Sequence, residues 1–133
     1  PEYGGDSREI GRCASAVEPI LAFPGHIAPN DLLFYHGNQF PENYKNGAFI
    51  AFHGSWNRGP LEEKGFHVAF APFDGKMPVG EWEVFADGFA GEGPIMNTGD
   101  AKYRPTGVAV GPDGSLFVSD SRNGKIWKIM YSK

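Results

Sequence analysis

The sequence predicts an all-β protein whose antiparallel, four-stranded sheets are of the kind that form the blades of a β-propeller. Three observations support this fold class. Short apolar runs recur between tight turns, the last thirty residues divide into three strands of similar length, and 19 glycines and 11 prolines accompany a hydrophobic fraction of 41%. A blade takes roughly 40–50 residues, so 133 residues suffice for about two blades and not for a closed ring.

The first part of the chain carries weak signals. Residues 1–12 are polar and rich in glycine, which predicts a loop, and Ala14–Phe23 is a candidate short strand before the Pro24-Gly25 turn. The first residue is proline and not methionine, which suggests that the chain begins inside a larger or processed product.

Four candidate strands separated by turns then predict one whole blade over about residues 25–88. Turn residues separate the strands at His36-Gly37-Asn38, at 54–64 and at Asp74-Gly75-Lys76. The predicted strands are Leu32–Tyr35, Ala48–His53, Phe66–Phe73 and Trp82–Phe85.

Residues 89–133 predict a second, incomplete blade. After a loop at 86–103, Val108 and Val110 alternate with Ala109, and the turn at 111–114 leads to the apolar run Leu116–Val118. We expect both segments to be inner strands packed on two faces. An Asn-Gly turn at 120–124 precedes Lys125–Tyr131, a strand with one wetter face. The missing fourth strand would come from the opposite end of the chain, and without it the unpaired edge is prone to associate.

Composition excludes several classes of function. The formal net charge is −4 and the Lys and Arg residues are scattered, so the sequence predicts no nucleic-acid partner. Apolar runs reach five or six residues, far short of the ~20 that span a membrane. Cys13 is the single cysteine, so no internal disulfide can form, and we expect an inert, packed thiol.

Four segments together resemble the C-terminal third of the glucose/sorbosone dehydrogenase family, which includes soluble aldose sugar dehydrogenases and L-sorbosone dehydrogenases. They are Phe-Pro-Gly-His-Ile-Ala-Pro at 23–29, the block 47–58 ending in His-Gly-Ser-Trp-Asn-Arg, Phe-Asp-Gly-Lys at 73–76, and the Arg-Pro-Thr-Gly turn region from 104. The resemblance covers nearly the whole chain, and the His-Gly-Ser-Trp-Asn-Arg block is its most specific part.

This resemblance implies a six-bladed propeller that binds pyrroloquinoline quinone (PQQ), usually with calcium, and oxidises an aldose or aldehyde sugar by hydride transfer to the quinone. It also implies a periplasmic or secreted protein whose partners are a sugar substrate and an electron acceptor, with the remaining blades or a second copy completing the ring. The catalytic base and the calcium ligands belong to earlier blades, so no catalytic or metal-binding residue is assigned here, and the isolated chain is expected to be inactive.

Arg104 is the first candidate cofactor-binding residue, because arginine can grip a carboxylate of the quinone bidentately. It corresponds to a cofactor-contacting arginine of the family, and the alternative is a solvated turn arginine. The family has a second arginine shortly after it, near the position of Thr106.

Three further cofactor-binding candidates are His26, His53 and Arg58, which lie in a loop or beside a turn at a strand end. His26 has the alternative of a hydrogen-bonded loop histidine. Trp56 could stack on the quinone, although a core position is favoured. His36 and His67 are expected in a turn and on a wetter strand face, without a function.

No spacing of His or acidic residues supports a transition-metal site or a glycosidase pair, and Gly54-Ser55-Trp56 lacks the hydrolase elbow. The alternative function is a non-catalytic propeller fragment whose loops at 54–64 and 86–103 bind a protein or a carbohydrate.

Overall fold

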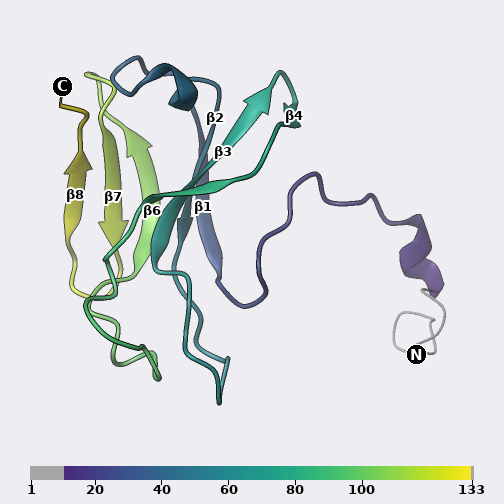
Figure 1. Cartoon of the computed structure of the whole chain (residues 1–133), viewed down its shortest axis with the longest axis vertical. Coiled ribbons are helices and arrows are strands. Elements are labelled where there is room, and N and C mark those ends of the chain that lie inside the picture. Colours follow the sequence, from purple (N-terminus) through teal and green to yellow (C-terminus); the bar gives the residue numbers. More distant parts are fainter. Residues whose placement is uncertain (1–10, 133) are drawn as a thin grey trace.

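Two antiparallel sheets form the framework of residues 11–132, the part of the chain that the computed structural model describes (Figure 1). Residues 1–10 of the predicted N-terminal loop lie outside the described residues. Two short 3-10 helices, η1 (Gly11–Ser15) and η2 (Glu42–Tyr44), are the helical elements within the described range. The all-β, antiparallel class is confirmed, whereas the assignment of the sheets to propeller blades stays a prediction.

The first sheet contains all four strands of the predicted first set. Neighbouring strands run β1–β2–β3, and both β4 and β5 pair with β3. The observed boundaries differ from the predicted ones by one to three residues, and the two-residue strand β4 was not predicted. The strands are β1 (Pro29–Tyr35), β2 (Gly47–Phe52), β3 (His67–Asp74), β4 (Met77–Pro78) and β5 (Glu83–Ala86).

The second sheet has three strands in the order β6–β7–β8. They are β6 (Pro105–Val110), β7 (Leu116–Asp120) and β8 (Ile126–Ile129), each joined to the next by one of the two predicted turns. The sheet is one strand short of four, as the sequence predicts. The expectation that β6 is packed on two faces is wrong, because Ala109 and Val110 are exposed.

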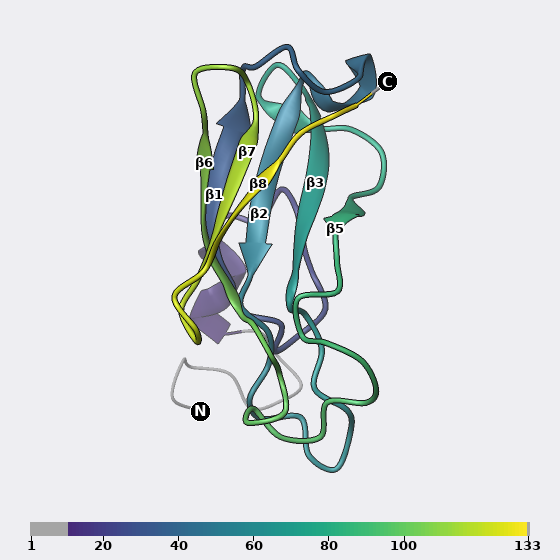
Figure 2. The same ribbon diagram turned by 90° about the vertical axis from the view of Figure 1, so that its left-hand side faces the viewer.

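The main core lies between the two sheets. Figure 2 shows the strands of the second sheet in front of those of the first, and one apolar cluster joins them. Alternate residues of each strand point into this layer, as the period of two requires. Its fully buried members include Tyr35, Phe49, Phe70, Leu116 and Val118.

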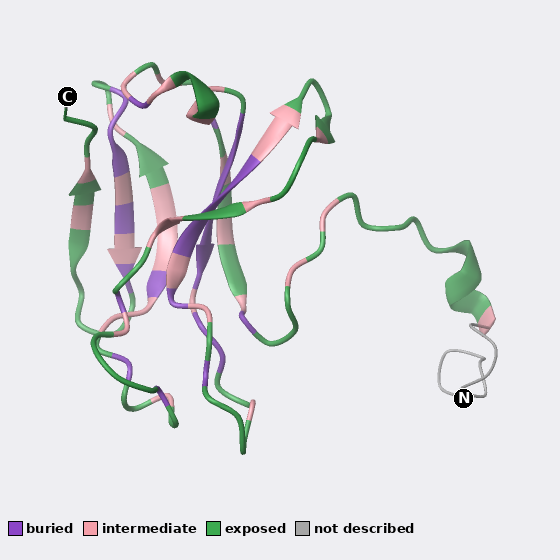
Figure 3. Cartoon of the chain, in the orientation of Figure 1, coloured by how far each residue is buried: buried purple, intermediate pink, exposed green. Residues whose placement is uncertain are grey.

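The opposite face of the first sheet is only partly covered. Ile50 and Phe52 of β2, which is buried along its whole length, pack there against Phe23 and Ile27. These come from the segment before β1, where no strand forms, so the predicted strand at Ala14–Phe23 is wrong. Most residues of 11–26 are exposed (Figure 3), and Cys13 is exposed rather than packed.

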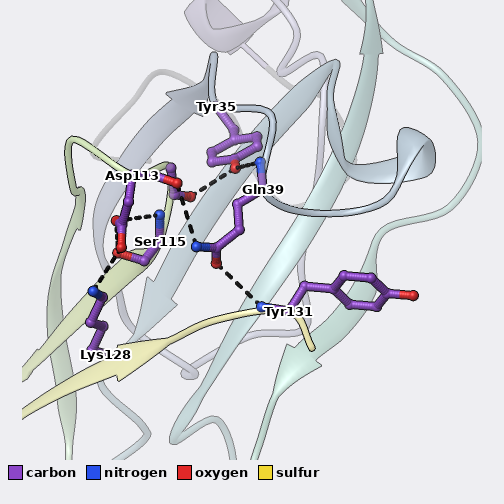
Figure 4. A network of polar contacts seen from close by, with 7 residues as sticks. Tyr35, Gln39, Asp113, Ser115, Lys128 and Tyr131 are labelled. Atoms are coloured by element: carbon purple, nitrogen blue, oxygen red, sulfur yellow. Dashed lines mark hydrogen bonds and ion pairs between the residues drawn. The ribbon is translucent and has the colours of Figure 1, made fainter. Parts of the chain in front are cut away.

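A hydrogen-bond network locks the two sheets together at the end where β1 finishes (Figure 4). The buried Tyr35 hydroxyl donates to the Gly114 carbonyl over 2.7 Å and accepts from the Gln39 amide over 3.2 Å. Gln39 also donates to the Asp113 carbonyl and accepts from the Tyr131 amide. This end therefore has a structural role, and the opposite end carries the predicted site residues.

Candidate functional site

The predicted site residues gather at one end of the two sheets, the lower end in Figure 1. Here β1 begins, β2 ends, β6 begins and β7 ends, because neighbouring strands are antiparallel. Backbone hydrogen bonds join the segments, with the amides of His53 and Gly54 donating to the carbonyls of Ala28 and Ile27. We call this junction the rim; it consists of residues 26–28, 53–55, 104–106 and 120–122.

Arg104 crosses from the second sheet to the first. Its Nε donates to the His53 carbonyl over 3.0 Å, and its Nη2 donates to the carbonyls of Gly54 and Ser55 over 2.7 and 3.2 Å. The guanidinium carbon lies 5.5 Å from the centre of the Phe66 ring, within cation–π range. Burial lowers the pKa of Arg104, and the nearby charge of Arg122 acts in the same direction. Arg104 is therefore not the solvated turn arginine of the alternative interpretation, because its guanidinium is held by three main-chain carbonyls.

Asp120 holds the backbone just before β6 in place through hydrogen bonds. Its buried carboxylate accepts the main-chain N–H groups of Arg104 (2.6 Å), Arg122 (3.1 Å) and Asn123 (2.6 Å). Burial by itself would raise the pKa of Asp120, but these hydrogen bonds outweigh it and hold the pKa below its ordinary value. Asp120 is thus the turn carboxylate that the sequence predicts, and it also fixes the backbone that carries both arginines.

His53 lies at the end of β2 with its imidazole beside the second sheet. Its Nε2 is 2.9 Å from the Ser121 hydroxyl oxygen. Burial lowers the pKa of His53, and the positive charge of Arg104 lowers it further. Both effects favour the neutral imidazole, in which one ring nitrogen donates a hydrogen bond and the other accepts one.

The other three candidates lie in different surroundings. His26 is exposed at the tip of a turn, and the Thr106 hydroxyl donates to the Arg104 carbonyl over 3.0 Å. Arg58 does not reach Arg104 or His53 but lines a separate cleft between the loops 54–66 and 87–95. The rim therefore unites four of the five candidates.

The backbone of the rim and of the adjoining Phe66 adopts conformations that residues other than glycine rarely take. His26, Ala28 and Phe66 all have positive φ, at 67°, 52° and 58°. Gly54 has φ 88° and lies so close to the Phe66 ring that a side chain at position 54 would overlap it. Such strain concentrates at functional sites.

One expectation about an aromatic side chain is wrong, because Trp56 is 71% exposed at the loop after β2 instead of lying in the core. His67 is half-buried on the partly covered face of the first sheet, where its ring lies near Phe52 and Trp82 with centroids at 5.0 and 6.2 Å.

Sequence reasoning missed Arg122 and Ser121. Arg122 follows β7 and donates through Nη1 and Nη2 to the carbonyls of Thr98 and Gly99. Within residues 11–132 neither Arg104 nor Arg122 forms an ion pair with a carboxylate. The sequence shows only that Arg122 lies in the turn at 120–124. The pairing of β7 with β6 brings this turn beside the start of β6. Two unneutralised guanidinium groups give the rim a positive charge that fits an anionic ligand.

Among the described residues no group of three or more His, Cys, Asp or Glu side chains is arranged to hold a metal ion. No helix in residues 11–132 is both long and apolar enough to cross a membrane.

The chain is similar in sequence to curated proteins that include a PQQ-dependent sugar oxidoreductase. It is 32% identical over 131 residues to a PQQ-dependent pyranose dehydrogenase of Coprinopsis cinerea, covering 87% of this chain and 17% of that protein. It is 33% identical over 119 residues to an uncharacterized protein of Borreliella burgdorferi, covering 88% and 29%. The chain thus spans less than a third of the length of these relatives.

Two solved structures share the fold. A calcium structure of the Trichoderma reesei carbohydrate-active enzyme of family AA12 matches with a TM-score of 0.60 and 23% identity, covering 86% of this chain and 27% of that one. A glucose dehydrogenase matches with a TM-score of 0.57 and 22% identity, covering 90% and 30%.

The family model described as TrAA12-like matches residues 6–132. The expected relation to PQQ-dependent sugar dehydrogenases is confirmed at the level of the family. The comparisons do not point to sorbosone dehydrogenases in particular. With nearly its whole length matched, the chain belongs to the TrAA12-like family.

Proposed function

We propose that this chain forms one wall of the cofactor site in a PQQ-dependent sugar dehydrogenase, with Arg104, Arg122 and His53 facing the quinone. The supporting observation is the rim itself, where two guanidinium groups without carboxylate partners lie on a backbone held by Asp120. Paired arginines are suited to a ligand with several carboxylates, because each one offers planar, charge-assisted hydrogen bonds.

The rim residues would bind and orient the cofactor. When bound, PQQ supplies the electrophile that accepts hydride from the sugar. Arg104 and Arg122 offset the negative charge of its carboxylates, and the neutral His53 imidazole offers a hydrogen bond without adding charge. His26 and Thr106 lie on the same rim and are proposed as polar neighbours, whereas Arg58 lines the cleft beside the rim and is not assigned a contact with the quinone.

The finer parts of the function come from the resemblance alone. They comprise oxidation of an aldose or a related aldehyde sugar, transfer of electrons to an acceptor, calcium bound by other parts of the propeller, and action in the periplasm or outside the cell. The catalytic base is likewise expected outside these residues, so the assembled ring would be the active enzyme.

One observation favours the alternative function, a binding module. The loop after β2 exposes Trp56 and Leu61, at 71% and 61%, where a carbohydrate or a protein could contact them. A module of this kind would bind its ligand without PQQ and would not need the charges of the rim.

Titration of the purified protein with PQQ distinguishes the two functions. We expect Arg122→Gln and Arg104→Lys each to weaken PQQ binding about tenfold, which is about 1.4 kcal/mol. Arg122→Gln removes a positive charge from the rim, and Arg104→Lys removes the guanidinium that is held in place by the carbonyls of residues 53–55. Lys76→Gln is the matched control, since it removes a positive charge at the exposed β3–β4 turn. If both arginine variants bind PQQ with unchanged affinity and keep the circular dichroism spectrum of the original protein, the rim is not part of the cofactor site.

A further inference from the structure

The chain contains two Asn-Gly pairs, Asn46-Gly47 and Asn123-Gly124. In such a pair the asparagine side chain readily loses ammonia, because glycine has no Cβ to hinder attack of its backbone nitrogen on the side-chain amide. The two pairs lie in opposite surroundings. The first leads into the buried strand β2, whereas the second lies in the turn between β7 and β8, directly after the rim residues 120–122 (Figure 1).

The turn between β7 and β8 leaves the Gly124 nitrogen accessible. Gly124 has φ 66°, and a side chain at this position would meet nothing within 4 Å, so the peptide group has room to rotate. Both residues of the pair are exposed. The Asp120 amide donates to the Lys125 carbonyl across the turn over 2.9 Å, whereas the Gly124 amide has no hydrogen-bond partner within residues 11–132. The attacking nitrogen is therefore neither shielded nor hydrogen-bonded.

The side chain of Asn123 is held at the surface of the same turn. Its Nδ2 donates to the Lys102 carbonyl over 2.7 Å, and its main-chain amide donates to Oδ2 of Asp120 over 2.6 Å. These contacts involve neither Cγ of Asn123 nor the nitrogen of Gly124, the two atoms that have to form a bond.

The charges around the turn favour the attack. Arg122 precedes the pair and Lys125 follows it, and both are exposed. The Gly124 amide must lose its proton before it can attack, and neighbouring positive charges stabilise the resulting anion. The carboxylate in the same turn, that of Asp120, is already hydrogen-bonded to main-chain N–H groups.

The pair Asn46-Gly47 lacks this freedom. Gly47 is buried and is paired with Tyr35 of β1 and Pro72 of β3. A side chain at Gly47 would overlap the ring of Phe70, so the backbone has no room to turn toward the side chain of Asn46. The chain therefore contains its own control, with the same dipeptide in a rigid strand.

We propose that Asn123 is a site of spontaneous deamidation that reduces the positive charge beside the rim. The Gly124 nitrogen loses its proton and bonds to Cγ of Asn123, the bond from Cγ to Nδ2 breaks, and ammonia leaves behind a cyclic imide. Water then opens the imide at either carbonyl and yields aspartate or isoaspartate. The product places a carboxylate next to Arg122 in the chain and can no longer donate to the Lys102 carbonyl.

Mass spectrometry of the purified protein, incubated at 37 °C in mildly alkaline buffer without PQQ, tests this proposal. Chymotrypsin, which cuts after aromatic residues, releases each pair in a peptide with a single asparagine, residues 118–127 and 45–49. We expect the 118–127 peptide to gain one dalton at least tenfold faster than the 45–49 peptide, and faster still as the pH rises. An unincubated sample digested in the same way corrects for deamidation during digestion.

Asn123→Gln is the matched control variant. Its side chain would have to close a six-membered ring, so the 118–127 peptide of this variant should gain no mass. Equal rates at the two pairs, or a 118–127 peptide of unchanged mass in the original protein, would overturn the proposal.

A second measurement reads the effect of the new charge on the rim, and this part rests on the proposed function. Asn123→Asp should weaken PQQ binding severalfold relative to Asn123→Gln, which keeps the charge of the turn. Equal affinities of these two variants would overturn the effect on the rim. Failure of the fresh, unmodified chain to bind PQQ would contradict the proposed function, whereas the mass measurement decides the deamidation in either case.

Discussion

At the scale of single residues, the buried carboxylate of Asp120 links the two strand ends that carry the rim. Its three backbone N–H partners would be left unsatisfied by Asp120→Ala, so we expect the free energy of unfolding to fall by at least ~2 kcal/mol. Urea denaturation measures this loss. Asp74→Ala, at an exposed turn, is the control and should change stability little. Equal stability of the two variants would show that the Asp120 contacts are not stabilising.

Two half-buried histidines predict how the stability of the fold depends on pH. Burial lowers the pKa of both His53 and His67 in the folded state, so protons bind the unfolded chain more tightly. Their contribution is complete above about pH 6.5, the ordinary pKa of histidine, and is lost as the pH falls below it. We expect the melting temperature to drop between pH 7.5 and 5.5, and to drop less in His67→Gln. A melting temperature that rises over this interval would contradict the account.

The sequence predicted part of the rim at this scale. Arg104 and His53 carried a recognisable motif, and the structure brings them together through three carbonyls of the 53–55 segment. Arg122 could not be predicted, because its position depends on the pairing of β6 with β7 and not on its neighbours in sequence. Trp56 was misplaced since aromatic character alone does not tell a core residue from an exposed loop residue.

At the scale of elements, the Tyr35 hydroxyl joins β1 to the β6–β7 turn. Tyr35→Phe leaves the Gly114 carbonyl and the Gln39 amide without this partner, so we expect a loss of about 1–2 kcal/mol in unfolding free energy. Tyr131→Phe is the matched control, because only the main-chain amide of Tyr131 enters the network (Figure 4). If both variants unfold at the same denaturant concentration, the network does not stabilise the junction.

Seven of the eight strands were predictable because alternation and turn residues are local signals. The strand β4 was not, since two residues carry no period. The strand expected at Ala14–Phe23 failed for a different reason: its apolar residues Leu21 and Phe23 pack on the first sheet as an irregular segment.

At the scale of the whole molecule, one face of the first sheet remains open to solvent. Leu32 and Phe34 of β1 and Val84 of β5 are about half exposed, at 50%, 48% and 46%. Leu32 and Val84 share a row of the sheet with the buried Ile50, so the two exposed side chains lie on the same face of the sheet. Such an apolar surface can pack against a further sheet. This agrees with the comparisons, in which the chain spans under a third of the length of its relatives.

We therefore expect the isolated chain to associate. Sedimentation velocity should show a mean mass that rises with concentration, and Phe34→Lys should reduce this rise because it places a charge on the apolar surface. Asn43→Lys, which adds the same charge at the exposed η2 helix, should not. A monomer at every concentration, with a sharp unfolding transition, would contradict this expectation.

The central claim, that the rim contacts PQQ, is tested most directly by hydrogen–deuterium exchange of the purified protein with and without the quinone. The account predicts slower amide exchange in three segments of the rim, 53–55, 104–106 and 120–122, when PQQ is bound, with no change in the turn at 111–115 at the opposite end. Quinone binding that leaves exchange at all three rim segments unchanged would contradict it.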